Sequence, residues 1–294
     1  MEGKTMLEPH LSLQMTLGEG PHWDEVAQCL YWVDILGGEL HRLDPVGEHH
    51  QVLRYDEPIA YAVADDAGGY LAAFRSGFWH LDEQGHKSHQ LVEGPQDPDV
   101  SWCNDGYCDA RGRLWMATKN AEERHPTAAL FSYQGGIKRH VENVTIGNGL
   151  AVSPDQRWLY FSDTPTYRIY RYPLDIDSAT LGEATLFADT RALALPGAPD
   201  GAAVDEAGNY WCAMYGGGVV VCLTPEGRVT ETLPLLAPNP TKVTFGDADY
   251  KTLYVTCARQ GLEAPTLAQY PDAGSLFSTR VTTPGLPAHR YRER

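Results

Sequence analysis

The chain has 294 residues and a formal net charge of −16, from 39 acidic and 23 basic residues. Such an acidic protein is not expected to bind nucleic acid or to dock on anionic membranes, because both partners attract basic surfaces. The hydrophobic share of 43% and the charged share of 21% are those of an ordinary globular protein, and the length is ample for a large core.

The six cysteines are scattered, and none belongs to a Cys-x-x-Cys pair. We expect them to be free thiols in a reducing compartment rather than a disulfide framework. The first eleven residues lack the apolar segment of a signal peptide, and no stretch approaches the roughly 18 apolar residues of a membrane span. The sequence therefore predicts a cytoplasmic protein, and it favours a monomer while leaving the oligomeric state open.

A repeated unit becomes visible when the turn residues that follow short apolar strands are aligned. The aligned residues are Asp24, Asp65, Asp109, Ser153, Asp205 and Gly246. Their spacings of 41, 44, 44, 52 and 41 residues are typical of propeller blades, which contain four strands each. The sequence therefore predicts an all-β, six-bladed propeller that forms one domain over residues 1–294.

Each unit reads as the same succession of strands. Runs of aromatic and β-branched residues after the aligned turns predict the second strands. These runs are 30–33, 114–116, 159–161, 210–212 and 253–255. An alternating third strand follows, as at 40–43 and 169–172, and a polar fourth strand such as 51–55 ends the unit. No long window has a helical period, so we expect almost no helix.

The sixth unit lacks a fourth strand of its own. Its predicted strands lie near 242–245, 252–256 and 276–281, and a basic tail follows from His289 to Arg294. We expect residues 10–15 to supply the missing strand, because closing the ring in this way removes an exposed sheet edge. The 52-residue unit contains an additional segment around 191–199, which we expect to form a loop on one rim.

Four of the units carry an oxygen-bearing side chain followed by glycine. The pairs are Glu19-Gly20, Asp105-Gly106, Asn148-Gly149 and Asp200-Gly201. Because innermost strands run along the central channel of a propeller, equivalent residues converge at one mouth. Such oxygens suit Ca²⁺, Mg²⁺ or Mn²⁺, and Zn²⁺ or Fe(II) is also compatible. The alternative is that these pairs are ordinary turn dipeptides, but their phase with the repeat favours a metal site.

The residues around these pairs form motifs that extend in order over nearly the whole chain. They are Leu-Gly-Glu-Gly-Pro-His-Trp at 17–23, Asn-Asp-Gly at 104–106, Gly-Arg-Leu-Trp at 112–115, Gly-Asn-Gly-Leu-Ala-Val-Ser-Pro-Asp at 147–155 and Pro-Asp-Gly at 199–201. In these motifs the sequence resembles the SMP-30/gluconolactonase/regucalcin family. The resemblance implies a six-bladed propeller with lactonase activity and one divalent metal ion.

The resemblance also implies roles for individual residues. The metal ligands of the family fall on Glu19, Asn148 and Asp200. Asn104 would contact the substrate and metal-bound water. Asp105, which the spacing alone offers as a ligand, would then stand behind the ligands rather than among them.

Candidate substrate contacts are less well marked. Many members of the family have Arg where this chain has Trp102, so an indole is expected to stack on the sugar in place of a guanidinium. The family's lid region matches only loosely, at residues 118–122. Lys119 and Glu122 of this segment are candidate substrate contacts, and the alternative is that the segment is a solvated loop on the rim. Tyr215 could line the mouth or pack within a blade. His22 is expected to point into its blade.

The chemistry implied is hydrolysis of a sugar lactone, such as that of gluconic, xylonic, arabinonic or galactonic acid, to the open acid. The metal would polarise the lactone carbonyl, and Asp200 would act as general base toward the attacking water. Two alternatives stay open: a promiscuous arylesterase or organophosphate hydrolase, and a calcium- or protein-binding propeller without catalysis. A serine hydrolase is disfavoured, because no Gly-x-Ser-x-Gly sequence occurs.

Overall fold

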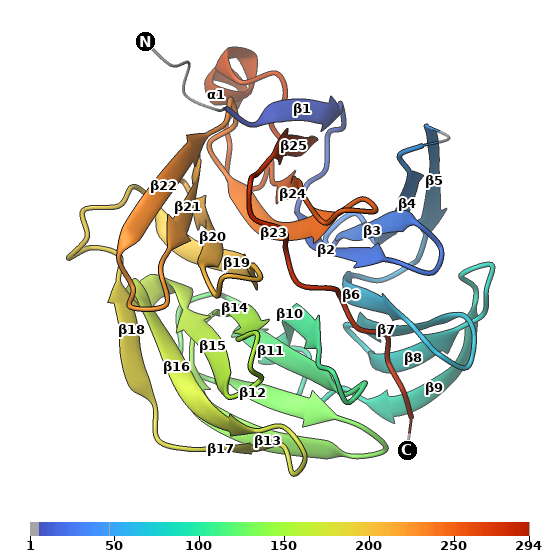
Figure 1. Cartoon of the computed structure of the whole chain (residues 1–294). Coiled ribbons are helices and arrows are strands. Elements are labelled where there is room, and N and C mark those ends of the chain that lie inside the picture. The colour runs from blue at the N-terminus through green and yellow to red at the C-terminus, as the bar shows by residue number, and fades with distance from the viewer. Residues whose placement is uncertain (1–5, 47, 294) are drawn as a thin grey trace.

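Six antiparallel sheets stand around a central channel in the computed structural model, which describes residues 6–46 and 48–293 (Figure 1). The first three sheets use consecutive strands, from the channel outward. They are β2 (Gly18–Asp24), β3 (Cys29–Asp34), β4 (Glu39–Asp44) and β5 (His49–Arg54); β6 (Ile59–Ala64), β7 (Tyr70–Phe74), β8 (Gly77–Leu81) and β9 (Lys87–Glu93); β10 (Ser101–Cys108), β11 (Leu114–Asn120), β12 (Ala128–Tyr133) and β13 (Ile137–Val144).

The last three sheets continue around the ring, and the sixth recruits the N-terminal strand. They are β14 (Gly147–Val152), β15 (Trp158–Asp163), β16 (Arg168–Asp175), β17 (Thr180–Leu181) and β18 (Thr185–Asp189); β19 (Ala198–Val204), β20 (Tyr210–Tyr215), β21 (Val219–Leu223) and β22 (Val229–Pro234); β23 (Pro240–Gly246), β24 (Thr252–Cys257), β25 (Leu276–Arg280) and β1 (Glu8–Leu11). The predicted six-bladed propeller is confirmed.

The ring closes because β1 pairs with β25 as the outermost strand of the last sheet. The prediction of an N-terminal closing strand is confirmed, but its predicted position, residues 10–15, was wrong. The strand ends at Leu11, and beyond it the backbone turns toward the core, where Met15 is buried. Closure gives the outer edge of β25 a partner, which removes a surface on which another chain could add a strand.

Helix is nearly absent from the described residues, as predicted: α1 (Ala264–Gln269) has six residues, and the 3₁₀ turn η1 (Thr164–Thr166) has three. No helix in this part of the chain is long and apolar enough to span a bilayer. The extra length of the fourth unit has two sources. A loop precedes β19, as expected, but β16 also continues into a hairpin with β17, which the sequence analysis missed.

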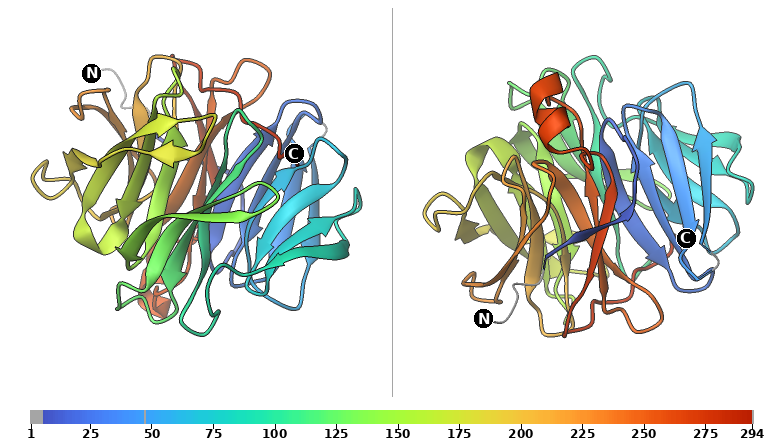
Figure 2. Two further views of the ribbon diagram at one scale, coloured as in Figure 1. Left: turned by 90° about the horizontal axis from the view of Figure 1, so that it is seen from below. Right: turned by 90° about the horizontal axis from the view of Figure 1, so that it is seen from above.

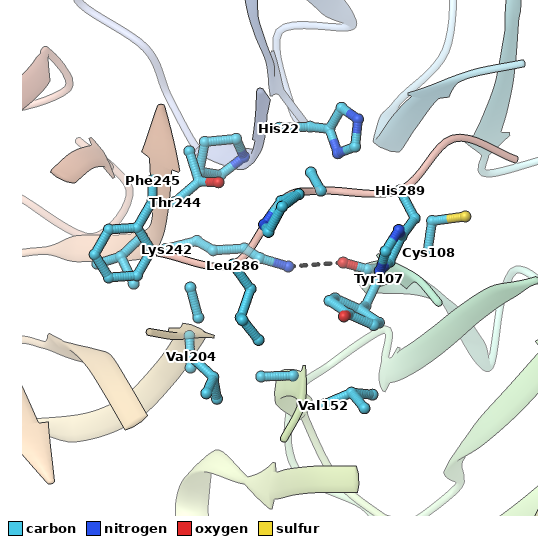
Figure 3. A pocket seen from close by; sticks show the side chains of 18 of the residues that line it. His22, Tyr107, Cys108, Val152, Val204, Lys242, Thr244, Phe245, Leu286 and His289 are labelled. Atoms are coloured by element: carbon cyan, nitrogen blue, oxygen red, sulfur yellow. Dashed lines mark hydrogen bonds between the residues drawn. The ribbon is translucent and has the colours of Figure 1, made fainter. Parts of the chain in front are cut away.

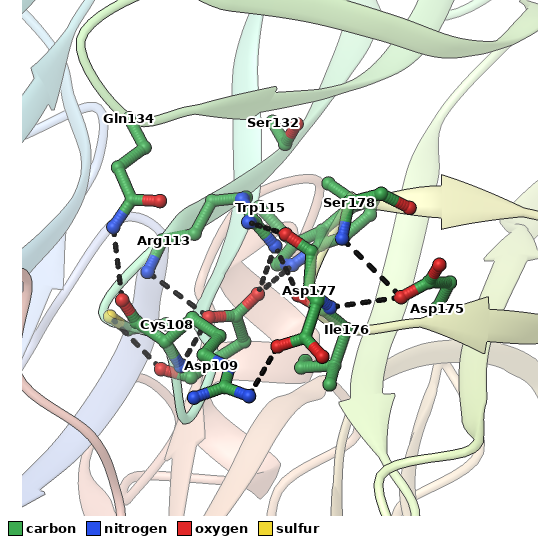
Figure 4. A network of polar contacts seen from close by, with 12 residues as sticks. Cys108, Asp109, Arg113, Trp115, Ser132, Gln134, Asp175, Ile176, Asp177 and Ser178 are labelled. Atoms are coloured by element: carbon green, nitrogen blue, oxygen red, sulfur yellow. Dashed lines mark hydrogen bonds and ion pairs between the residues drawn. The ribbon is translucent and has the colours of Figure 1, made fainter. Parts of the chain in front are cut away.

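The aligned turn residues are structural. Asp109 directly follows β10, the innermost strand of the third sheet. Its Oδ1 atom accepts hydrogen bonds from the backbone of Arg111 and Arg113. Its Oδ2 accepts from the Trp115 Nε1 atom at 2.8 Å and from Arg113 at 3.1 Å. Arg113 then donates to the Ile176 carbonyl and so ties the third sheet to the fourth (Figure 4). The repeat could be recognised in the sequence because a turn of this kind recurs between the first and second strands of the blades.

The predicted second strands form the packed interior between sheets. Trp32, Trp115 and Tyr210 are fully buried there. All six cysteines are buried in the same interior as free thiols, which confirms that part of the prediction. Reduced cysteines of this kind pack as small apolar side chains.

The C-terminal tail crosses the end of the channel at which the innermost strands finish (Figure 1). Leu286 donates a backbone hydrogen bond to Val204, and Tyr291 forms a parallel bridge with Asp65. Arg290 makes an ion pair with Asp24 at 2.7 Å, so the basic tail pairs with an acidic aligned turn. Figure 2 shows α1 on one rim and the C-terminal end toward the opposite rim. The tail covers only one end of the channel, so the mouth on the α1 side remains available for a binding site.

Candidate metal and substrate site

Three of the predicted metal ligands lie at the mouth where the innermost strands begin. Glu19, Asn148 and Asp200 come from β2, β14 and β19, and their exposed fractions are 4%, 3% and 6%. They line one cavity of about 90 Å³. The other residues that line it are Leu17, Asn104, Lys119, Glu123, Ile146, Thr164, Tyr215 and Gln260. Ring closure thus brings Glu19 and Asp200 to one cavity although they are 181 positions apart in the sequence (200 − 19).

The glycines after Glu19 and Asn148 have a conformational role. Gly20 and Gly149 have φ angles of +55° and +70°, in the left-handed region that favours glycine. The pairing of both innermost strands with their neighbours shifts register at these residues, which marks a β-bulge. A bulge bends the strand and re-aims a side chain. The bulges therefore explain why Glu19 and Asn148, the candidate ligands, do not follow the regular alternation of side chains between the two faces of the sheet.

The glycines after Asp105 and Asp200 have a steric role instead. A Cβ atom on Gly106 would lie 2.5 Å from the Tyr61 ring, and one on Gly201 would lie 2.4 Å from the Cβ and Cγ atoms of Lys242. Both distances are too short for any Cβ contact. Gly149 combines both roles, because a Cβ atom there would also lie 2.4 Å from the Tyr210 hydroxyl.

The side-chain amide of Asn148 is held at both ends. Its Oδ1 atom accepts a hydrogen bond from Asn104 Nδ2 at 3.0 Å, and its Nδ2 atom donates to Thr164 Oγ1 at 2.8 Å. Thr164 in turn donates to the Pro199 carbonyl. The Asn148 amide is thereby held in one orientation at the cavity wall, and an amide oxygen of this kind suits a hard cation.

The two carboxylates of the cavity strongly disfavour negative charge in the absence of a cation. Burial, and then the nearby Asp105 carboxylate, raise the pKa of Glu19 to about 8. Burial and the Glu19 carboxylate raise the pKa of Asp200 well above its usual range. Among the described residues, no basic side chain donates a hydrogen bond to either carboxylate. Desolvated, mutually repelling oxygens of this kind fit a divalent cation.

The donor set is small. No group of three or more His, Cys, Asp or Glu side chains that could hold a metal is present in residues 6–46 and 48–293. The candidate centre instead combines two carboxylates with the Asn148 amide oxygen, which leaves coordination positions for water or substrate. Oxygen-only donors of this number favour Ca²⁺, Mg²⁺ or Mn²⁺ over metals that need thiolate or imidazole.

Asp105 does not line the cavity. Its Oδ2 atom accepts from the Leu150 backbone at 2.9 Å, and its Oδ1 atom forms an ion pair with Lys242, which also donates to the Gly106 carbonyl at 2.7 Å. Sequence reasoning missed Lys242. A signal was available, because Lys242 is the one charged residue of β23, an innermost strand that is buried throughout, and a buried charge must find a partner.

Behind Lys242 the channel holds a second cavity of about 60 Å³, closed by the C-terminal tail (Figure 3). His22 lines this cavity with His289 of the tail, so the expectation that His22 points into a blade was wrong. The His22 ring meets Tyr61 edge-on, and its buried Nε2 atom has no hydrogen-bond partner. Burial lowers the pKa of His22 to about 4, so the ring is neutral at pH 7.

The predicted substrate contacts are placed unequally. Lys119 and Tyr215 line the cavity, and the Tyr215 hydroxyl donates to the Gln260 carbonyl at 3.1 Å. Glu122 is exposed outside the cavity wall, and the next residue, Glu123, lines it instead and pairs with Lys119 at 2.7 Å. Trp102 is buried beneath, with the Lys119 ammonium 5.0 Å from its ring centroid. The indole therefore faces a cation rather than the cavity.

Comparison with known proteins finds relatives that match most of the chain. The profile of the SMP-30/Gluconolactonase/LRE-like region matches residues 17–259. The 6-deoxy-6-sulfogluconolactonase of Pseudomonas putida is 41% identical over 271 residues, which are 92% of each protein. The regucalcin of Oryctolagus cuniculus is 31% identical over 286 residues, covering 93% of this chain and 94% of regucalcin.

Solved structures agree with this relationship. Regucalcin from Agrobacterium tumefaciens, described as a calcium-binding protein, matches with a TM-score of 0.93 and 25% identity, over 99% of this chain and 100% of that chain. The class defined by fold and site is a six-bladed propeller that presents carboxylate and amide oxygens at one mouth of its channel. Within that class, the chain belongs to the SMP-30/gluconolactonase family, as its motifs predicted.

Proposed function

We propose that the protein hydrolyses a sugar lactone to the corresponding aldonic acid and that the reaction requires one divalent metal ion. The observation that carries the proposal is the pair of buried carboxylates, Glu19 and Asp200, which line one cavity with the fixed amide of Asn148. Family membership supports the same reading, since one relative is named as a lactonase. Glu19, Asn148 and Asp200 would hold the metal.

When bound, a divalent cation would polarise the lactone carbonyl and favour the ionised forms of both carboxylates. Asp200 would accept a proton from the water whose oxygen attacks the carbonyl carbon. The bond from that carbon to the ring oxygen then breaks, and the ring oxygen leaves as a hydroxyl group after taking up the proton that Asp200 accepted from the water. Glu19 and Asn148 would serve as anchors.

Polar groups around the cavity would orient the sugar. The Asn104 amide nitrogen is engaged by Asn148 and by the Gly147 carbonyl, which leaves its Oδ1 atom for a substrate hydroxyl. Lys119 and Glu123 offer a donor and an acceptor side by side. Tyr215 contributes an aromatic face at the same mouth. A few directed polar groups in a partly apolar cleft are typical of small-molecule sites.

The particular lactone and the native metal are matters for experiment. The metal is removed by chelation, Ca²⁺, Mg²⁺, Mn²⁺, Zn²⁺ or Fe(II) is added back singly, and acid release is followed with gluconic, xylonic, arabinonic and galactonic lactones. Because the Pseudomonas relative is named as a sulfogluconolactonase, a lactone that carries a sulfonate at C6 belongs in the panel. Phenyl acetate and paraoxon test the arylesterase and organophosphate hydrolase alternatives.

The decisive variant is Asp200→Ala. We expect it to lose metal-dependent lactone hydrolysis while Asp249→Ala, which removes an exposed carboxylate paired with Arg280, keeps it. Full metal-dependent activity in Asp200→Ala would contradict the proposal. Tight binding of Ca²⁺ with no turnover of any lactone would instead favour a calcium-binding propeller without catalysis.

A further inference from the structure

A buried ion pair spans the channel directly behind the candidate site. Lys242 comes from β23 of the last sheet and Asp105 from β10 of the third, and their side chains are 5% and 1% exposed. Neither residue lines the cavity that contains Glu19 and Asp200. The pair is therefore hidden both from solvent and from a substrate at the mouth.

The Asp105 side of the pair touches two strands of the site. Asp105 directly follows Asn104, which lines the cavity. Its Oδ2 atom accepts a hydrogen bond from the backbone of Leu150, two residues after Asn148. The carboxylate is thus one residue from a proposed substrate contact and is bonded to the strand of a proposed ligand.

The Lys242 side touches the remaining two strands. The lysine stem lies against Gly201, the residue after Asp200, so closely that no side chain fits there. The preceding residue, Thr241, donates its hydroxyl to the carbonyl of Gly18, next to Glu19. Residues 241 and 242 of β23 therefore contact the backbone directly beside both carboxylates of the cavity.

The buried charges around the cavity can be counted. Three buried carboxylates converge on the channel: Glu19, Asp200 and Asp105. The Lys242 ammonium is ion-paired with Asp105 alone and makes no hydrogen bond to the other two among the described residues. The Lys119 ammonium at the cavity wall is likewise paired, with Glu123, so two negative charges remain to face a cation, which equals the charge of one divalent ion.

We propose that Lys242 is a positioning residue that acts through Asp105: it keeps this carboxylate turned away from the mouth and cancels its charge, so that the site is matched to a single divalent ion. This inference rests on the proposed metal-dependent function. It predicts that neutral substitutions of the two partners change metal affinity in opposite directions. Substitution of Lys242 removes a positive charge behind the site, whereas substitution of Asp105 removes a negative one.

The test measures Ca²⁺ and Mn²⁺ binding by calorimetry on the chelator-treated full chain. We expect Lys242→Met to bind the metal more tightly and Asp105→Asn more weakly than the wild type, each by on the order of tenfold. The double variant is expected to return to within a few-fold of the wild type. Lys87→Met removes an ion pair with Glu57 outside the channel and serves as the matched control with unchanged affinity.

Melting temperatures establish that each variant is folded, since an unpaired buried charge is destabilising. Should one single variant fail to fold, the double variant and the other single variant still give the sign of the effect. Equal weakening in both single variants, or unchanged affinity in both, would overturn the inference and leave the proposed function standing. A wild-type protein that binds neither ion and needs none for turnover would overturn both.

Discussion

Asn104 donates from Nδ2 to the side-chain oxygen of Asn148 at 3.0 Å, across the gap between the third and fourth innermost strands. Together with the Thr164 hydroxyl, which accepts from the other end of the Asn148 amide, it leaves this amide one orientation. A ligand oxygen fixed in advance does not have to give up rotational freedom when an ion binds.

Thr164→Val should therefore weaken divalent metal binding without removing any ligand. The valine keeps the shape of the side chain but cannot accept the hydrogen bond from Asn148, so the amide is free to turn. Lost support of a ligand typically costs about 10–100-fold in metal affinity. Calorimetric titration checks this, with Thr166→Val as the control, because its hydroxyl bonds only within the same turn. Equal affinities of the two variants would contradict the prediction.

His22 should make the protein more sensitive to acid. Its pKa is about 4 in the folded state because of burial, against 6.5 for an ordinary histidine. Between these values the unfolded chain binds a proton that the folded chain refuses, so stability is lost as the pH falls from about 6.5 to 4. At about 1.4 kcal/mol per pH unit, the full loss is ~3 kcal/mol.

The measurement is urea unfolding at pH 7 and pH 4.5 for the wild type and His22→Asn. Other groups also contribute to acid sensitivity, so the quantity of interest is the difference between the two proteins, which should shrink or change sign at the lower pH. His125→Asn removes an exposed histidine and should follow the wild type. A His22→Asn variant that parallels the wild type across this range would sink the prediction.

The fold was readable from the sequence because its signals are local. Asp109 accepts backbone hydrogen bonds from residues two and four positions further on, and Asp205 makes the same kind of turn. A turn built from neighbours recurs wherever the unit recurs, so its period is visible without any structure. The candidate ligands could be selected from the sequence as well, since Glu19, Asn148 and Asp200 stand at a fixed distance before such turns.

The parts of the site that the sequence could not supply depend on contacts between distant strands. Lys242 and Asp105 are 137 positions apart, and only the closed ring brings them together. Trp102 lies under Lys119, which a single strand pattern cannot foretell. The shift from Glu122 to Glu123 arises in an exposed loop, where no alternation of buried and exposed residues fixes the register.

Gly149→Ala should damage both stability and the site. Gly149 has φ of +70°, and a Cβ there would lie 2.4 Å from the hydroxyl of the fully buried Tyr210, which donates to the Gly149 carbonyl. Strain and the clash together should cost at least ~2 kcal/mol, measured by urea unfolding. Gly136→Ala is the matched control, because a Cβ there meets nothing within 4 Å. A Gly149→Ala variant as stable as that control, with normal metal binding, would show that the bulge is dispensable.

Glu123→Gln and Glu122→Gln form a pair of neighbouring substitutions that separates the cavity wall from the exposed rim. Glu123 holds the buried Lys119 ammonium at 2.7 Å, whereas Glu122 lies outside the cavity lining. Under the proposed function, loss of the Glu123 charge removes an acceptor for a sugar hydroxyl and loosens Lys119.

We expect Glu123→Gln to raise KM for a sugar lactone by roughly 3–10-fold with little change in kcat, because the lost hydrogen bond of about 1 kcal/mol serves binding rather than the reacting atoms. Glu122→Gln should leave both constants as they are. Steady-state kinetics with a single lactone decides the matter. A larger effect at Glu122 than at Glu123 would mean that the loop closes over the substrate in a different register from the one seen in the free protein.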